Sequence, residues 1–484
     1  MKTILYPVRH ILLGLSLLTV SSCKVYMTTP QVANPLPSSF GQVSTNDSLT
    51  MAAQQWQTFY SDTCLTALIS AALQHNPDIQ IAMENIHVAH SMYATTRSKL
   101  FPRIDGVISA RVDKFGEYTM NGVGNDDTNR SETLPDDKKL PAPYPEFFTG
   151  VNFSWEANLW GKLSNQRRAS LARFMASKEA RHGASTMLIS NVAEYYYTLI
   201  GLDQEKKVLQ QNLELQEMAF DLVKVQKLGG KVTQLGVDQF ESQLLNTRAR
   251  LLQVDQQILV TESILNRLAG RYPQSIRRWT INEYDSILEI SVGVPDRLIY
   301  RRPDVREAEL SLQAAGADVA VARAAFYPGL SLSAAAGFSA FTVSKWFLTP
   351  GSAVYSLGGG LTAPIFQRGK IKALFNAANA KQRIAMAEYQ RSLLSAYQEV
   401  YSVAHNHYNL VQQIDLKEQE VAVQRRASVT SNDLFSVGYA NYLEVITSQR
   451  RLLDVELELA HLKRNVLQNR AVLYRALGGG WSER

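Results

Sequence analysis

Two histidines, His405 and His407, flank Asn406, and imidazoles this close in sequence can hold a transition metal when both face one ion. The surrounding residues have a helical pattern, however, and side chains two positions apart on a helix point about 200° away from each other. The pair therefore does not converge, and we predict no metal site there. The run of tyrosines at 195–197 must also occupy different helix faces, so we expect it to pack and not to form a ligand cage.

Other arrangements that could support chemistry are missing from the sequence. We find no glycine-rich phosphate loop, no nucleophile triad and no thiolate metal motif. The net charge of +6 is small for 484 residues, and basic residues are interspersed with acidic ones, so nucleic acid is not an expected partner. The sequence thus offers no catalytic centre and no cofactor site.

The N-terminus has the pattern of an export signal. Lys2 and Arg9 precede an apolar run from Ile11 to Leu18, which is too short to span a hydrocarbon core about 30 Å thick. Small residues directly before Cys23 resemble a bacterial lipobox, in which the cysteine becomes the lipidated first residue of the mature protein. An ordinary cleavage site beside a cysteine is the alternative. We predict a signal peptide over residues 1–22 and lipidation of Cys23.

The residue after Cys23 indicates in which membrane a lipoprotein is retained. An aspartate at that place tends to hold a lipoprotein in the inner membrane, and this chain has Lys24, so the outer membrane is expected. Cys64 is then the only free thiol in an oxidising compartment, which excludes an intramolecular disulfide. Stability must come from burial or from partner chains.

The chain contains an internal duplication. NPDIQIAMENIHVAHSMYATTRSKLFPRI, around Pro77, aligns with RPDVREAELSLQAAGADVAVARAAFYPGL, around Pro303, at an offset of 226 residues. Later matches share an offset of 208: Gly161 with Gly369, Gly230 with Gly438, and Gly270 with Gly478. The difference of 18 residues falls between Pro102 and Gly161, in a stretch that has the composition of a long polar loop.

In each copy the apolar period changes to two after the first helix. Ile104, Ile108 and Val112 alternate with polar residues, and so do the apolar residues of VNFSWE and GLSLSAAAGFS; the return strand SLGGGLTAPIF is rich in glycine and less regular. We expect two hairpins, over about 102–160 and 328–366, with strands of roughly 10 residues that are apolar on one face, as in transmembrane β-barrels. Half-buried strands of a soluble sheet would show the same alternation.

A sheet in a membrane has to close into a barrel so that its edge strands find backbone partners. Four strands cannot close a barrel, and an open edge in hydrocarbon costs several kcal/mol for each unpaired backbone group. Either several chains share one barrel, or the strands are not in a membrane.

The remaining sequence predicts very long helices. Residues 371–437 contain neither glycine nor proline, and a helix of 67 residues extends about 100 Å. The matching stretch, 162–228, is interrupted only by Gly183 and Gly201. Two apolar stripes along 452–474 would let one helix contact a neighbour on each side, as in a hollow ring. A wide apolar face against an ordinary core is the alternative.

The motifs NPDIQIA…FP, FSWEANLWGK, RRPDVREAE…FYPGLSL, LTAPIFQRGK and VGYANYLEVITSQRRLL together resemble the TolC/OprM-type outer-membrane efflux proteins, in the lipidated OprM-like branch. The resemblance covers nearly the whole mature chain. It implies a mainly α protein with a membrane β-barrel, in which an internally duplicated protomer gives four strands to a shared twelve-stranded trimeric barrel. That barrel would be continuous with a long α-helical barrel.

The resemblance also implies an organisation and a function. A lipidated N-terminal segment (23–65) would be followed by a first repeat (66–270), a connecting equatorial segment (271–299) and a second repeat (300–484). A homotrimer would be the passive exit channel of a tripartite efflux pump in the outer membrane of a Gram-negative bacterium. An inner-membrane RND-type transporter and a periplasmic adaptor would be its partners, and neither catalysis nor a cofactor is expected.

The family's periplasmic constriction can be carried onto NYLEVITSQR. The OprM-like constriction falls on Leu443, Thr447 and Arg450, and the TolC-like acidic ring falls partly on Glu444. An aspartate is common where this chain has Thr447, so the usual Asp–Arg latch is in doubt, and Glu444 with Arg450 is a candidate replacement. For each residue, the alternative is an exposed coiled-coil position.

Two turns would form the tips that meet the adaptor, at Gly229-Gly230 and at Gly438-Tyr439. Two other functions fit the same pattern: the outer-membrane duct of a type I-like protein secretion system, and a lipid-anchored periplasmic coiled-coil scaffold without a pore. Conductance across a planar bilayer separates the scaffold from both ducts.

Overall fold

A computed structural model of the chain describes Pro37, residues 54–284 and residues 299–479. The predicted signal peptide, Cys23, and parts of the lipidated and connecting segments lie outside the described residues. The chain forms two compact units. Within the described residues, the first contains Ser91–Ala172 and Leu312–Ile384, and the second contains residues 54–90, 173–284, 299–311 and 385–479. Each unit therefore combines corresponding parts of both repeats.

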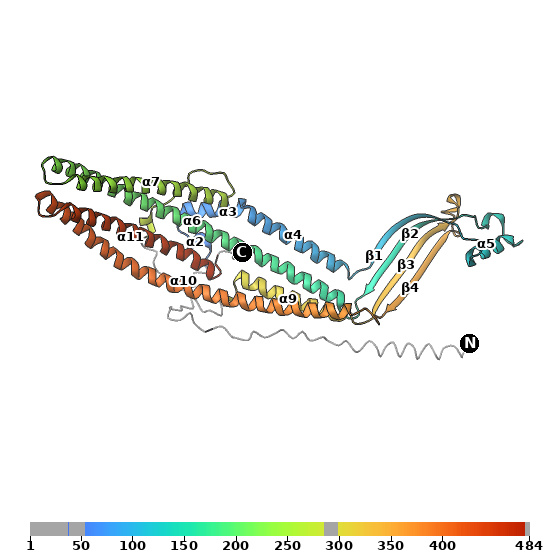
Figure 1. Cartoon of the computed structure of the whole chain (residues 1–484). Helices are drawn as coiled ribbons and strands as arrows, with labels where there is room; N and C mark the ends of the chain where they lie inside the picture. Colours follow the sequence, from blue (N-terminus) through green and yellow to red (C-terminus); the bar gives the residue numbers. More distant parts are fainter. Residues whose placement is uncertain (1–36, 38–53, 285–298, 480–484) are drawn as a thin grey trace. The chain divides into compact units, whose positions relative to one another are not determined.

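The first unit contains one four-stranded antiparallel sheet in the order β1-β2-β3-β4 (Figure 1). Its strands are β1 (Arg103–Asp113), β2 (Tyr144–Ala157), β3 (Gly329–Ala340) and β4 (Ala353–Thr362). The two predicted hairpins are thus joined through β2 and β3, where Val151 lies opposite Ala336. Gly150 and Gly337 pair beside them, and a Cβ on either glycine would lie within 2.4 Å of a backbone oxygen of the other strand, so the close approach requires glycine.

The register of the strands separates apolar from polar residues across the whole sheet. Residues directly opposite one another share a face. One row across the sheet is Ile104, Phe153, Ala334 and Leu357, and the neighbouring row is Arg103, Ser154, Ser333 and Gly358. The described residues leave the apolar face uncovered, since Ile108 is 79% and Leu357 85% exposed. A sheet with this division is suited to lipid on one side and water on the other.

The 18 extra residues of the first repeat are not only a loop. They include helix α5 (Met120–Arg130), which begins where the Thr119 hydroxyl accepts a hydrogen bond from the Gly122 N–H. Asn129 then exchanges two hydrogen bonds with the backbone of Leu140, at 2.9 and 2.8 Å. These local side-chain bonds stabilise a helix that polar composition alone does not predict.

The long helices occur as pairs of matching length. They are α4 (Pro77–Ser98) with α9 (Pro303–Ala324), α6 (Lys162–Leu228) with α10 (Lys370–Val437), and α7 (Gln234–Leu268) with α11 (Tyr442–Ala476). Every glycine of positive φ in the described chain belongs to one of three pairs 208 residues apart, which are the same three pairs found in the sequence. None of the helices within residues 54–284 and 299–479 is both long enough and apolar enough to cross a membrane.

A buried carboxylate joins the short elements of the second unit. Asp62 is fully buried; its Oδ1 accepts hydrogen bonds from the first backbone N–H groups of α3 (Thr63–His75), and its Oδ2 accepts from the hydroxyls of Tyr196 and Tyr284, both at 2.5 Å. Burial, followed by the interactions with Asp62, raises the pKa of Tyr196, which remains a neutral donor. Tyr196 and Tyr197 are therefore packed, as predicted for the run, whereas Tyr195 is 39% exposed.

Candidate functional site at the ends of the helical hairpins

Two helical hairpins, α6–α7 and α10–α11, end in turns of the same design. In the first, the Gly230 N–H donates to the Lys227 carbonyl and the Lys231 N–H donates to the Gln226 carbonyl, at 2.9 and 3.0 Å. The second turn repeats this around Gly438, and both glycines have positive φ, as a Schellman motif requires. The predicted tip residues Gly229, Gly230, Gly438 and Tyr439 all lie in these two turns.

The tips expose apolar side chains. Leu228 is 88%, Val437 67% and Tyr439 85% exposed, and they flank or lie within the two turns. Three exposed apolar side chains thus lie at or beside the two turns.

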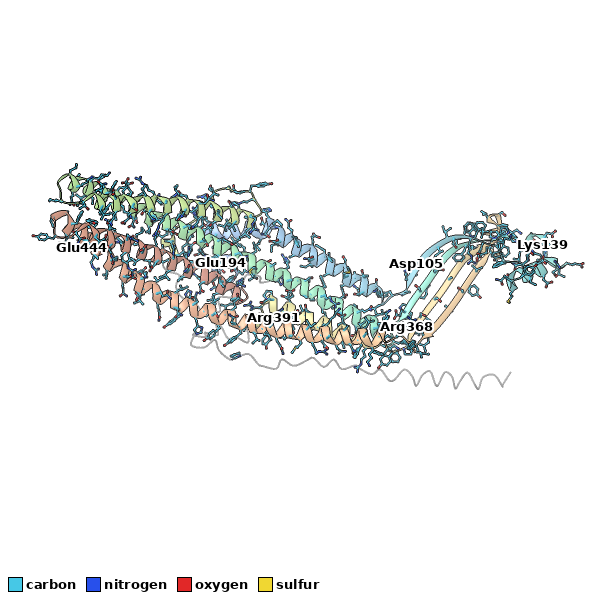
Figure 2. The ribbon with its side chains drawn as sticks, viewed as in Figure 1. Asp105, Lys139, Glu194, Arg368, Arg391 and Glu444 are labelled. Atoms are coloured by element: carbon cyan, nitrogen blue, oxygen red, sulfur yellow. The ribbon has the colours of Figure 1, made fainter. Side chains whose placement is uncertain are left out.

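Helix α11 begins with a capping box. The Asn441 side chain accepts hydrogen bonds from the N–H groups of Leu443 and Glu444, at 2.9 and 3.1 Å, and the Glu444 carboxylate accepts from the Asn441 N–H at 3.2 Å. Figure 2 labels Glu444 at the end of this hairpin. Within the described residues, no ion pair joins Glu444 to Arg450, so the replacement latch considered from the sequence is not formed in this protomer.

The other three predicted gate residues lie together. Leu443, Thr447 and Arg450 follow one face of α11 and line a groove of about 460 Å³ against α7. From α7 the groove is lined by Gln239, Ser242, Asn246 and Arg250. Leu443 is 57% exposed, and Thr447 and Arg450 are also exposed. The groove is therefore open, and its lining combines three apolar side chains, Leu443, Ile446 and Leu453, with a larger number of polar ones.

Three charged residues line this groove without a partner. Arg250, Arg450 and Asp454 form no ion pair within the described part of the chain. Most of the charges on the adjacent helix faces are paired, for example Arg248 with Glu217 at 2.8 Å and Arg451 with Glu420 at 2.6 Å. The groove thus carries two arginines against one aspartate.

Ion pairs connect α10 to α11 beside the groove. Lys417 donates to Glu420 and to Glu458, both at 2.6 Å. The hydrogen bond from Lys417, and then that from Arg451, holds the pKa of Glu420 below its ordinary value. The hydrogen bond to Glu420 in turn raises the pKa of Lys417. Glu420 and Lys417 are therefore charged at neutral pH.

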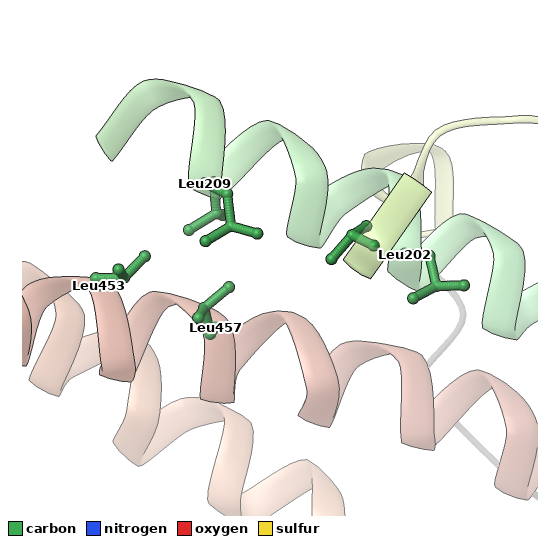
Figure 3. Packing of buried hydrophobic residues seen from close by; sticks show 6 residues of the cluster. Leu202, Leu209, Leu453 and Leu457 are labelled. Atoms are coloured by element: carbon green, nitrogen blue, oxygen red, sulfur yellow. The ribbon is translucent and has the colours of Figure 1, made fainter. Parts of the chain in front are cut away.

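The hairpins share a core that alternates between apolar and polar levels. One apolar cluster includes Leu202 and Leu209 of α6, which face Leu453 and Leu457 of α11 (Figure 3). A second lies nearer the tips and consists of Val223, Val237, Phe240, Phe435, Val445 and Ile446. Between these clusters in sequence, α6, α7 and α11 bury polar residues: Asn212, Gln216, Thr247 and Gln449.

This polar level is incompletely hydrogen-bonded. Gln216 is 2% exposed, and neither its amide oxygen nor its amide nitrogen has a hydrogen-bond partner in the described protein. Gln449 donates to Asn432 at 3.3 Å, but its oxygen is also without a partner. Unsatisfied buried amides destabilise a core, so this polar level weakens the packing of the hairpins.

The α7 residues that line the groove were not among the site residues predicted from the sequence. Gln239 and Asn246 stand 208 residues before Thr447 and Asp454, so matching positions of the two repeats face one another. This signal was available, since applying the offset of 208 to the gate residues of the second repeat identifies the α7 positions directly. The offset does not identify Arg250, because its equivalent is Glu458, which pairs with Lys417 outside the groove.

The two histidines considered as metal ligands have different surroundings. His405 stacks on Tyr401, with ring centroids 4.2 Å apart, and its Nδ1 lies 2.8 Å from the Tyr401 carbonyl oxygen. His407 is buried, with 2% of its surface exposed.

Comparison with known proteins gives one family. Residues 68–271 and 294–479 match the family described as outer membrane efflux protein. Among curated relatives, the cation efflux system protein CusC of Escherichia coli K12 is 27% identical over 470 residues, covering 96% of this chain and 97% of CusC. The pyoverdine export outer membrane protein OpmQ of Pseudomonas putida is 28% identical over 470 residues, covering 97% of this chain and 96% of OpmQ.

A solved structure supports the fold. The Campylobacter jejuni CmeC outer membrane channel superposes with a TM-score of 0.81 at 22% identity, covering 94% of each chain. The expected fold class, mainly α with strands that contribute to a membrane β-barrel, is confirmed by this likeness and the family match. The family match covers most of both repeats and concerns channel proteins, not enzymes. The chain belongs to the outer membrane efflux protein family.

Proposed function

We propose that three copies of this chain form the exit channel of a tripartite efflux pump and conduct small molecules passively out of the cell. The observation that carries the proposal is the four-stranded sheet, which has one continuous apolar face and ends at β1 and β4. In hydrocarbon the outer edges of β1 and β4 need backbone partners. Pairing β4 of one copy with β1 of the next satisfies both edges, and three copies of four strands make a closed barrel of twelve.

The strand lengths support a membrane position. The four strands have 11, 14, 12 and 10 residues, and a tilted strand of about 9–11 residues crosses the hydrocarbon core. The polar face, with Arg103, Asp105 and Asn152, would line a water-filled lumen. Lipid attached to Cys23 would anchor each copy to the same membrane.

The helical hairpins would form the periplasmic tunnel and its gate. We propose that Leu443, Thr447 and Arg450 narrow the passage near the tips, while Glu444 supports the start of α11 through its capping box. The turns at Gly229-Gly230 and Gly438-Tyr439, with their exposed apolar neighbours, would contact a periplasmic adaptor. The adaptor would connect the channel to an inner-membrane RND-type transporter.

The cargo would be chosen upstream of the channel. CusC is named for cations and OpmQ for pyoverdine, so relatives of similar identity serve different cargoes. We propose that the transporter selects the cargo class. A duct for protein secretion and a scaffold without a pore are the competing functions.

A cross-linking experiment tests the proposed closure. Ser109 of β1 and Ser356 of β4 lie on the polar face of the two edge strands, and cysteines there would be joined between copies by a flexible bismaleimide. The expected result is a covalent trimer on a denaturing gel, without larger species, because a closed ring has no free edge. Cysteine at Ser333, on the inner strand β3, replaces Ser356 in the matched control and should give much less trimer.

Conductance tests the channel itself. Purified trimer in a planar bilayer should conduct, and Leu443→Ala should raise the open probability or the conductance by enlarging the constriction. A protein that never conducts, even as Leu443→Ala, would contradict the channel and favour the scaffold.

A further inference from the structure

The groove between α7 and α11 carries an unbalanced positive charge. Arg250 and Arg450 line it from facing helices, and Asp454 is the one carboxylate among its lining residues. None of the three has an ion-pair partner in the described chain, and Thr447 contributes no charge. Each protomer therefore presents a net charge of +1 at this level, from two arginines and one aspartate.

The ion-paired charges next to the groove do not cancel the excess carried by its lining residues. Arg451, the next residue along α11, is paired with Glu420 at 2.6 Å, and Arg248, two residues before Arg250, is paired with Glu217 at 2.8 Å. A paired charge acts on a passing ion mainly as a dipole, whose field falls off faster than that of a free charge. Glu444 keeps its charge of −1, because its hydrogen-bond partner Asn441 is neutral, but it is not among the residues that line the groove.

We infer that the constriction favours anions over cations. The inference rests on the proposed function, because it requires three grooves to converge on one passage. Three copies would then place six arginines and three aspartates around a narrow aqueous path. Rings of arginine make pores selective for anions, and a fixed charge acts over about 10 Å at 0.1 M salt, which is comparable to the radius of such a passage. The channel would pass anionic or neutral cargo readily and would resist free metal cations.

The test is the ratio of chloride to potassium permeability. Wild-type trimer in a planar bilayer with a KCl gradient should give a ratio above 1, and the ratio should fall toward 1 as salt rises from about 0.1 M to about 1 M and the screening length shortens to about 3 Å. Arg450→Gln should lower the ratio by about threefold or more, because one free charge is lost from each protomer. Thr447→Asp should lower it at least as far, by placing a carboxylate in the same groove.

Arg451→Gln is the matched control. It removes the same charge from the adjacent residue, but outside the groove and from an existing ion pair, so the permeability ratio should stay within error of wild type. Arg250→Gln is a second test variant. It should lower the permeability ratio about as much as Arg450→Gln does, although Arg250 lies on another helix.

The outcomes separate the inference from the proposed function. A channel that conducts but prefers potassium, or one whose preference responds equally to Arg451→Gln and Arg450→Gln, overturns the inference and leaves the channel intact. A protein that does not conduct at all, including as Leu443→Ala, overturns both.

Discussion

Arg425 and Glu456 form an ion pair of 2.5 Å between α10 and α11, and the first repeat contains the same pair with its signs reversed. The positions 208 residues earlier are Glu217 and Arg248, which form an ion pair of 2.8 Å between α6 and α7. The two repeats have therefore retained the bridge and exchanged its charges. A cross-helix ion pair therefore occurs at this level in both hairpins, with opposite polarity.

Exchange of the charges should be tolerated in the second repeat. We expect Glu456→Arg alone to lower the melting temperature, because it places two arginines in contact, and we expect Arg425→Glu in the same chain to restore most of the loss. Exposed pairs couple by about 0.2–1 kcal/mol, so the effect is small but measurable in a double-mutant cycle. Thermal unfolding of the detergent-solubilised protein measures it. Equal losses in the single and double variants would show that Glu456 acts through Asn212, which donates to it at 3.1 Å, and not through Arg425.

Gly201 should not tolerate a side chain. A Cβ at this position of α6 would lie 2.5–2.9 Å from the Cδ, Cγ and Cβ atoms of Arg464 on α11. Gly201→Ala should therefore destabilise the protein by about 1–3 kcal/mol through overpacking, even though alanine favours a helix.

Gly183 is the matched control for this prediction, because it lies in the same helix and a Cβ there would come no closer than 3.8 Å, to Pro303. Gly183→Ala should stabilise the protein by up to about 1 kcal/mol. Adding Arg464→Ala to Gly201→Ala should recover stability. If both glycine variants raised the melting temperature, the close packing of α6 on α11 at Gly201 would be refuted.

Gln216→Met should stabilise the hairpins. Methionine has nearly the same shape and needs no hydrogen bond, whereas both amide atoms of Gln216 are buried without a partner. Removing this unsatisfied amide should raise stability by about 1–3 kcal/mol. Gln424→Met, at the equivalent position of the second repeat, removes an amide that donates to the Ser448 carbonyl at 3.2 Å. This substitution should therefore lower the stability of the protein. A lower melting temperature for Gln216→Met would indicate that the amide is satisfied in solution.

The Lys417 ion pairs should stabilise α10 against α11 over a defined pH range. The hydrogen bond with Lys417 lowers the pKa of Glu420 in the folded protein. The contribution of Glu420 to the free energy of unfolding is therefore complete above its pKa in the unfolded chain, about 4.5, and is lost as pH falls through the lower pKa of the folded protein. The pKa of Lys417 is raised in the folded protein. Its contribution to the free energy of unfolding is therefore complete below its pKa in the unfolded chain, about 10.5, and is lost as pH rises through the higher pKa of the folded protein.

The difference in melting temperature between wild type and Lys417→Met should consequently be constant between about pH 6 and pH 9 and shrink toward about pH 3. Comparing the two proteins at each pH removes the contribution of other carboxylates. A difference that persisted in acid would assign the effect to packing of the lysine stem.

Much of the fold could be predicted because its determinants are local. The absence of glycine and proline from 371–437 predicted helix α10, and the structure has it from Lys370 to Val437. The alternation of side chains predicted both hairpins, and the repeated glycines predicted the turns. The least regular segment, β4, is a strand because it pairs with β3, and helix α5 was missed because two Asn129 hydrogen bonds with Leu140 stabilise it.

The candidate site was only partly predictable. Leu443, Thr447 and Arg450 could be placed on one helix face from their spacing alone, and the structure brings them to one groove. Arg250 could not be found, because its proximity depends on how α7 packs against α11. The capping box of Asn441 and Glu444 was not predicted, although the spacing of an asparagine three residues before a glutamate is visible in the sequence.

By itself, the sequence determined the long helices and the regular strands, which strand face is apolar, and that the chain is duplicated, since each depends on residues close together or on an exact spacing. Tertiary structure alone decided the pairing of β2 with β3, the charge of the α7–α11 groove, and the bond between Asp62 and Tyr284, which are 222 residues apart. These features arise from contacts between distant segments, and no local pattern specifies which distant segment a side chain meets.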